Sequence, residues 1–187
     1  MKLAVFCGAR YGKEKKYINL ATEIGEYVAE KRLGLVYGGS FSGLMGAVST
    51  GVLAKNGHVT GIYPRGLFDD ELPREEVSEF IYTETMDERK QLLINKSDAY
   101  LILPGGLGTL EELSQVLCSI SIGLIPKKPI GILNIDGFYK PLVDFLVHAA
   151  DEEFIDPETI KHVLVSADYK SLIDQISTQL AEMKEVA

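Results

Sequence analysis

Short apolar runs alternate with longer amphipathic segments along the whole chain. The runs are apolar at consecutive positions, which is typical of parallel strands buried on both faces of a sheet. We expect strands near residues 3–7, 35–37, 59–62, 80–82, 99–103, 130–133 and 162–165, and helices near residues 16–31, 43–55, 87–96, 109–122, 139–150 and 169–184. This alternation predicts an α/β fold, with a Rossmann-like, doubly wound parallel sheet in a single domain over residues 1–187.

Two glycine-rich turns stand where an expected strand leads into an expected helix. They are YGGSFSGLMG at residues 37–46 and LPGGLGTLEE at residues 103–112. Glycines let a backbone approach a ligand closely, and the N-terminus of a helix offers unpaired N–H groups that favour a phosphate. The two turns are expected to face each other where the strand order reverses. We expect the glycines of the first turn to serve packing and those of the second to contact a ligand.

The second turn ends on the acidic pair Glu111 and Glu112. A carboxylate one turn from an anion site needs a chemical role, so Glu112 is a candidate catalytic group. In the first turn of a helix its ionised form is favoured by the helix dipole, which suits a base or a stabiliser of positive charge rather than a general acid. The alternative is structural, because Thr109 and Glu112 also have the spacing of a capping box.

A second charged segment, MDERK at residues 86–90, precedes the strand expected at residues 99–103. Arg89 offers a bidentate fork for a phosphate or carboxylate, and Lys90 offers a point charge. The alternative is a solvent-exposed helix start, in which Asp87 and Glu88 pair with nearby bases.

Composition and charge disfavour several classes of partner and cofactor. With 187 residues, 46% of them hydrophobic, and a net charge of −8, the chain suits one buried domain and disfavours nucleic-acid polymers and anionic membranes as partners. A small anionic ligand remains compatible with this charge. The chain has no GxGxxG or GxxxxGK[ST] motif, no metal-ligand spacing and no run long enough to span a membrane. Cys7 and Cys118 are expected to be buried thiols in a reducing compartment, the cytoplasm.

The segment at residues 110–125 is apolar at positions that cover nearly every face of a helix. A helix that is apolar all round is buried on all sides. Because one sheet covers only its inner face, we expect a second copy of the chain to cover the outer face in a homodimer.

The charged and glycine-rich segments together resemble those of a known family. The stretch from Pro104 to Glu112 resembles the PGGxGTxxE signature of the Lonely Guy family, and Met86-x-x-Arg89-Lys90 resembles its companion motif. Members are cytokinin riboside 5′-monophosphate phosphoribohydrolases, often labelled lysine decarboxylases. The resemblance runs from residue 5 to about residue 154. The first loop departs from it, since Cys7-Gly8-Ala9-Arg10 stands where the family usually has Cys-Gly-Ser-Ser.

The resemblance implies a homodimeric enzyme that hydrolyses the N-glycosidic bond of adenosine-type 5′-monophosphates, with neither a cofactor nor a metal. Arg89 and Glu112 map onto the family's catalytic pair. The implied substrate contacts are Glu71, Met86, Lys90, Gly105, Gly106, Leu107, Gly108, Thr109 and Glu111. The alternative is a non-catalytic protein of the same fold that binds or carries a nucleotide or a phosphorylated cofactor.

Overall fold

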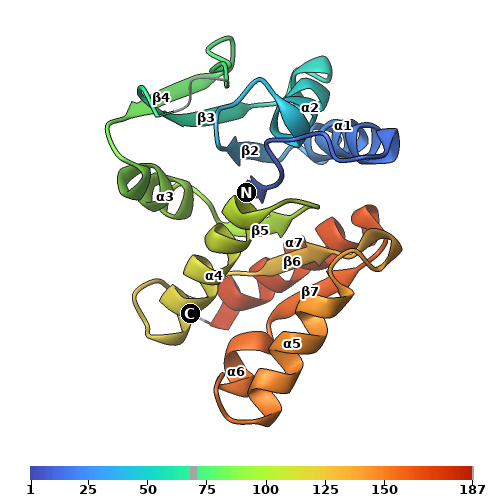
Figure 1. Ribbon diagram of the computed structural model, residues 1–187, viewed down its shortest axis with the longest axis vertical. Coiled ribbons are helices and arrows are strands. Elements are labelled where there is room, and N and C mark those ends of the chain that lie inside the picture. Colours follow the sequence, from blue (N-terminus) through green and yellow to red (C-terminus); the bar gives the residue numbers. More distant parts are fainter. Residues whose placement is uncertain (68–70, 187) are drawn as a thin grey trace.

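The computed structural model describes residues 1–67 and 71–186, which form a seven-stranded parallel sheet covered by helices on both faces (Figure 1). The strands are β1 (Lys2–Phe6), β2 (Gly34–Tyr37), β3 (Val59–Pro64), β4 (Glu79–Thr83), β5 (Ala99–Ile102), β6 (Ile130–Leu133) and β7 (Val163–Ser166). The helices are α1 (Lys15–Glu30), α2 (Gly43–Ala54), α3 (Met86–Asn95), α4 (Leu107–Ser121), α5 (Lys140–Asp151), α6 (Pro157–Ile160) and α7 (Tyr169–Val186), with a 3₁₀ turn η1 (Ile135–Gly137).

The strand order is β4-β3-β2-β1-β5-β6-β7, and the order reverses beside β1. Strand β1 pairs in parallel with β2 on one side and with β5 on the other, so that Ala4 lies opposite both Val36 and Tyr100. The loops that leave β1, β2 and β5 therefore meet at one edge of the sheet. Ligands of open α/β sheets bind at this switch point, and the predicted doubly wound fold is confirmed.

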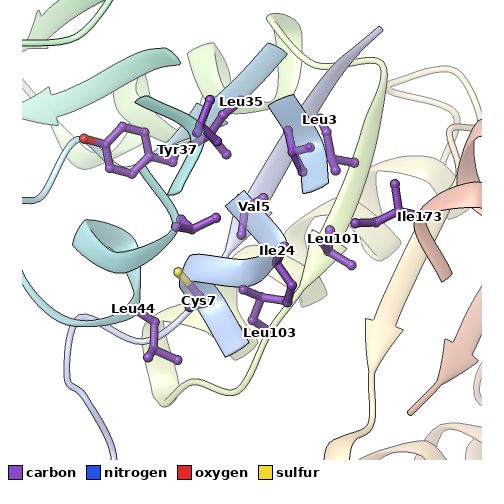
Figure 2. Packing of buried hydrophobic residues seen from close by; sticks show 14 of the residues in the cluster. Leu3, Val5, Cys7, Ile24, Leu35, Tyr37, Leu44, Leu101, Leu103 and Ile173 are labelled. Atoms are coloured by element: carbon purple, nitrogen blue, oxygen red, sulfur yellow. The ribbon is translucent and has the colours of Figure 1, made fainter. Parts of the chain in front are cut away.

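Two apolar layers account for the uninterrupted apolar runs of the strands. Leu3 and Val5 of β1 face α1, α2 and α7, in the layer that Figure 2 shows. Ala4 and Phe6 of the same strand face α3, α4 and α5. Since consecutive side chains of a strand point to opposite faces, burial of both faces requires apolar residues at every position.

Two short elements were not predicted. Helix α6 spans four residues, and Asp156 caps it by accepting a hydrogen bond from the backbone N–H of Glu158 at 2.9 Å, with Pro157 in the first turn. An Asp-Pro pair is a recognised helix start, but the segment is too short to show a hydrophobic period. The turn η1 has no periodic pattern either, and it contains Asp136 at a positive φ of 50°.

Helix α4 corrects two expectations. Its inner face packs on the sheet through Leu113, Val116 and Leu117, but its outer face is polar. Exposed apolar side chains lie at its first residue and just beyond its last one instead, with Leu107 86% and Leu124 73% exposed. The expectation of a helix apolar all round is therefore wrong. The expectation of two buried thiols is wrong for Cys118, which is exposed on this helix, and right for Cys7.

Within the described residues, no helix is both long and apolar enough to span a membrane.

Candidate active site

A cavity of about 570 Å³ opens at the switch point, within the range of small-molecule sites. Both glycine turns, the loop after β1 and the loop between β3 and β4 contribute to its wall. The predicted site residues that line it are Glu71, Met86, Arg89, Gly105, Gly106, Leu107, Gly108, Thr109 and Glu112. Segments far apart in the sequence are thus brought to one site.

Arg89 is the most constrained charged residue of the cavity. It is 6% exposed, and its guanidinium donates to the backbone oxygen of Ile62 through Nε at 3.1 Å and to that of Gly38 through Nη2 at 3.2 Å. Its Nη1 lies 3.6 Å from Oε1 of Glu112. Three groups from three different segments therefore fix the guanidinium plane and leave it little freedom to move.

The start of α3 positions Arg89 in the cavity. Thr85 caps the helix by accepting from the backbone N–H of Glu88 at 3.1 Å, and the Glu88 carboxylate accepts from the backbone N–H of Glu84 at 2.9 Å. Asp87 pairs with Lys90 at 3.3 Å. The alternative of an exposed helix start with paired acids thus describes Asp87, whereas Glu88 accepts from the backbone and Arg89 is buried. A capping pair is present in the chain, but at Thr85 and Glu88.

The capping-box interpretation of Thr109 and Glu112 is wrong. Helix α4 begins at Leu107 with Gly106 as its N-cap, and that cap has no side-chain hydrogen bond. Thr109 is therefore already inside the helix, where it is 3% exposed and lines the cavity. Glu112 lies in the second turn, so its carboxylate is free of any capping role and faces Arg89.

The environment of Glu112 reverses a second expectation. Burial raises the pKa of its carboxyl from the ordinary value to about 7, although the positive charge of Arg89 acts in the opposite direction. The helix dipole, which falls off beyond the first turn, does not compensate for the loss of water. Near neutral pH both forms of the carboxyl are populated, so this group can accept a proton and also return it.

Lys90 and Glu111 bind each other rather than line the cavity. Nζ of Lys90 lies 2.9 Å from Oε1 of Glu111, and neither residue belongs to the cavity wall. This ion pair joins α3 to α4 and so ties the helix of Arg89 to the helix of Glu112. Their contact with substrate stays a prediction.

The loop that carries Glu71 is held at several points. Tyr63 donates from its hydroxyl to the backbone oxygen of Glu71 at 2.8 Å, and Phe41 donates from its backbone N–H to the oxygen of Leu72 at 2.8 Å. Residues 68–70 of this loop lie outside the described residues. Glu71 lines the cavity, so this loop forms part of the cavity wall.

Gly38 and Gly43 show why the first turn is rich in glycine. A Cβ on Gly38 would lie 2.0 Å from Nη2 of Arg89, and a Cβ on Gly43 would lie 2.2 Å from the backbone oxygen of Ala9. The packing role expected for these glycines is confirmed at Gly43. Gly38 also belongs to the site, because it accepts a hydrogen bond from Arg89 and lines the cavity.

Sequence reasoning missed one side of the cavity. Arg10 and Tyr11 from the loop after β1, Tyr17 from α1 and Phe138 after η1 line it as well. The rings of Tyr17 and Phe138 meet edge to face at 6.1 Å. The position of the loop after β1, at the same sheet edge as the two glycine turns, was a signal that could have identified Arg10 and Tyr11.

Solved structures of similar fold come from proteins of low sequence identity. The molybdenum cofactor binding protein of Rippkaea orientalis matches with a TM-score of 0.72 at 21% identity, over 96% of each chain. The molybdenum cofactor carrier protein of Chlamydomonas reinhardtii matches with a TM-score of 0.73 at 20% identity, over 96% of this chain and 98% of that one. These similarities establish the fold that the sequence predicts.

Sequence relatives are much more similar. Residues 45–176 match the family described as "Possible lysine decarboxylase". The chain is 43% identical to cytokinin riboside 5′-monophosphate phosphoribohydrolase LOG5 of Arabidopsis thaliana, over 94% of this chain and 76% of the relative. It is 41% identical to the phosphoribohydrolase LOG of Oryza sativa subsp. japonica, over 89% of this chain and 68% of the relative. The chain, with its two motifs meeting in one cavity, therefore belongs to the Lonely Guy family.

Proposed function

We propose that this protein hydrolyses the N-glycosidic bond of adenosine-type 5′-monophosphates, including cytokinin riboside 5′-monophosphates, to the free base and ribose 5-phosphate. The observation that carries the proposal is the Glu112 carboxyl, buried opposite a fixed Arg89 and one turn from a glycine-rich helix start. The names of relatives about 40% identical over most of the chain support it.

The mechanism follows from where charge develops during the reaction. Cleavage of the bond between C1′ and the base leaves positive charge on the ribose, and the bonding electron pair departs with the base. The ionised Glu112 carboxylate stabilises that charge and accepts a proton from the water that attacks C1′. The departed base takes up one proton from solvent and Glu112 releases its proton, so that free base and ribose 5-phosphate form and the carboxylate is regenerated. A guanidinium does not act as a proton donor in proteins, so the role of Arg89 is to hold Glu112 and the ribose in position.

The alternative function is binding without cleavage, and one experiment separates the two. Purified protein is incubated with AMP and with an N6-prenylated AMP, and the free base is measured by chromatography. The proposed enzyme releases base and ribose 5-phosphate in equal amounts from at least one of them. A carrier binds the nucleotide, as measured by calorimetry, and leaves the bond intact.

The pH dependence of the reaction is expected to report Glu112. Because the pKa of its carboxyl is about 7, the group is protonated and inactive as a base below that value. We expect kcat/KM for AMP to rise as the pH increases through about 7 and then to level off. Base release is measured between pH 5 and 9 at constant ionic strength. An acidic limb centred near the ordinary glutamate pKa would contradict the assignment of the base.

We also propose that the chain works as a homodimer. Exposed apolar side chains include Leu107 at the start of α4, Ile122 (64% exposed) and Leu124 just after its last residue, and Phe145 of α5 (61% exposed). Contiguous exposed apolar patches mark protein interfaces, and Ile122 and Leu124 lie two positions apart in the chain. Light scattering at micromolar concentration is expected to give twice the chain mass. A monomer at that concentration would contradict the proposal.

The proposal also covers the domain organisation, the location and the partners of the protein. We propose that residues 1–187 act as a single domain, in the cytoplasm, on a small-molecule substrate and without nucleic-acid polymers as partners. The net charge of −8 and the two free cysteines support this.

A further inference from the structure

The carboxylates of the cavity wall are expected to repel an anionic substrate. Two carboxylates, Glu71 and Glu112, line the cavity together with two arginines, Arg10 and Arg89. A phosphate carries up to two negative charges, and carboxylates at short range repel it. A cation that is not already neutralised by the protein therefore strengthens its binding.

The cations named by the motifs are already engaged. Arg89 is bound to Glu112 and to two backbone oxygens. Lys90 is paired with Asp87 and Glu111 and lies outside the cavity wall. Lys90 cannot turn to a phosphate without breaking the ion pair that joins α3 to α4, and the charge of Arg89 is already shared with Glu112.

Arg10 is different. It is exposed, it lines the cavity, and its side chain makes no hydrogen bond or ion pair with any part of the chain that the structure describes. Its guanidinium is thus a cation with its five N–H donors available to a ligand.

The backbone beside Arg10 is held between the two glycine turns. Gly8 donates from its N–H to the backbone oxygen of Pro104 at 3.1 Å and accepts from the N–H of Leu44 at 2.9 Å. Gly43 packs against the same loop, where a Cβ would lie 2.7 Å from the backbone nitrogen of Arg10. The loop is therefore placed beside the N-terminus of α4, where the backbone N–H groups favour a phosphate.

We propose that Arg10 binds the 5′-phosphate of the substrate and sets the preference of this site for nucleotides over nucleosides. The inference rests on the proposed function and adds a residue to it. The glycine turn and the start of α4 supply backbone donors on one side of the phosphate, and the Arg10 fork supplies the compensating charge on the other. The departure from the family in the first loop, Ala9-Arg10, thus concerns the phosphate.

The test compares AMP with adenosine in Arg10→Ala, Arg10→Lys and the control Lys13→Ala. Lys13 is an exposed cation of the same loop outside the cavity wall, so its removal changes net charge equally. We expect Arg10→Ala to raise the Kd and KM for AMP on the order of tenfold to a hundredfold, with kcat and adenosine affinity little changed. Arg10→Lys should recover part of the loss, and Lys13→Ala should behave as the wild type.

The outcomes separate this inference from the proposed function. Unchanged AMP affinity in Arg10→Ala, or an equal loss for AMP and adenosine, would overturn the role of Arg10 even if the wild type releases base. Conversely, an AMP affinity that depends on Arg10 in a wild-type protein that releases no base would support the phosphate site and refute the hydrolase. A wild type that neither binds nor cleaves AMP refutes both.

Discussion

Replacement of Glu112 by glutamine is expected to lower the rate of base release on the order of a hundredfold or more. The amide nearly matches the carboxyl in shape, so it keeps contact with Arg89 and leaves the packing of α4 intact. It carries no charge, and therefore neither stabilises an oxocarbenium-like ribose nor accepts a proton from water. Binding of AMP should be retained or slightly tighter, because a carboxylate near a phosphate is repulsive.

The measurement uses purified Glu112→Gln, with free adenine and AMP affinity determined on the same preparation. Glu182→Gln serves as the control, since Glu182 is exposed on α7. Near-normal release of adenine by Glu112→Gln would show that the chemistry resides in another group. Loss of binding together with loss of release would instead indicate that Glu112 holds the substrate.

Gly38→Ala is the second substitution with a large expected effect. The new Cβ would lie 2.0 Å from Nη2 of Arg89 and 2.8 Å from Sδ of Met45, so the guanidinium must leave its position. Arg89 then loses its bond to the backbone oxygen of Gly38 and its alignment with Glu112. A displacement of this kind is expected to cost on the order of a hundredfold in kcat/KM.

Gly34→Ala is the matched control for this substitution. Gly34 begins β2, three residues before its end, and a Cβ there meets Lys2 at an ordinary distance of 3.6 Å. We expect Gly34→Ala to release base at nearly the wild-type rate, while circular dichroism and thermal melting confirm that both variants fold. Equal activity of the two variants would mean that the position of Arg89 does not limit the reaction.

The fold was predictable because its signal is repeated at every strand. An uninterrupted apolar run such as residues 99–103 is typical of a strand buried on both faces, and the alternation of seven expected strands with helices predicts a doubly wound parallel sheet. Helix α6 was not predicted because its four residues make little more than one turn, which is too short to show a hydrophobic period.

The sequence predicted the site residues that belong to recognisable motifs, but not the features that depend on local backbone conformation. The segments of Arg89 and Glu112 stand out in the sequence, but the start of α4 does not, because Gly106 at its N-cap has no side chain to mark it. The expected helix start at residue 109 lies two residues after the observed one and places Glu112 in the first turn, where the helix dipole would lower its pKa. Burial in the second turn raises that pKa instead. The proposed role of Arg10 depends on which cations the fold leaves unpaired, which the sequence alone does not specify.

The buried carboxyl of Glu112 also makes the protein's stability depend on pH. Its pKa is about 7 in the folded chain against 4.5 as an ordinary side chain, so between these values the folded state binds more protons than the unfolded state. The free energy of unfolding therefore falls as the pH rises from about 4.5 to 7, by a contribution on the order of 3 kcal/mol from this group. The ionised form of Glu112 that the reaction requires is thus also the form that lowers the stability of the fold. A ligand that binds only the folded state raises the free energy of unfolding again.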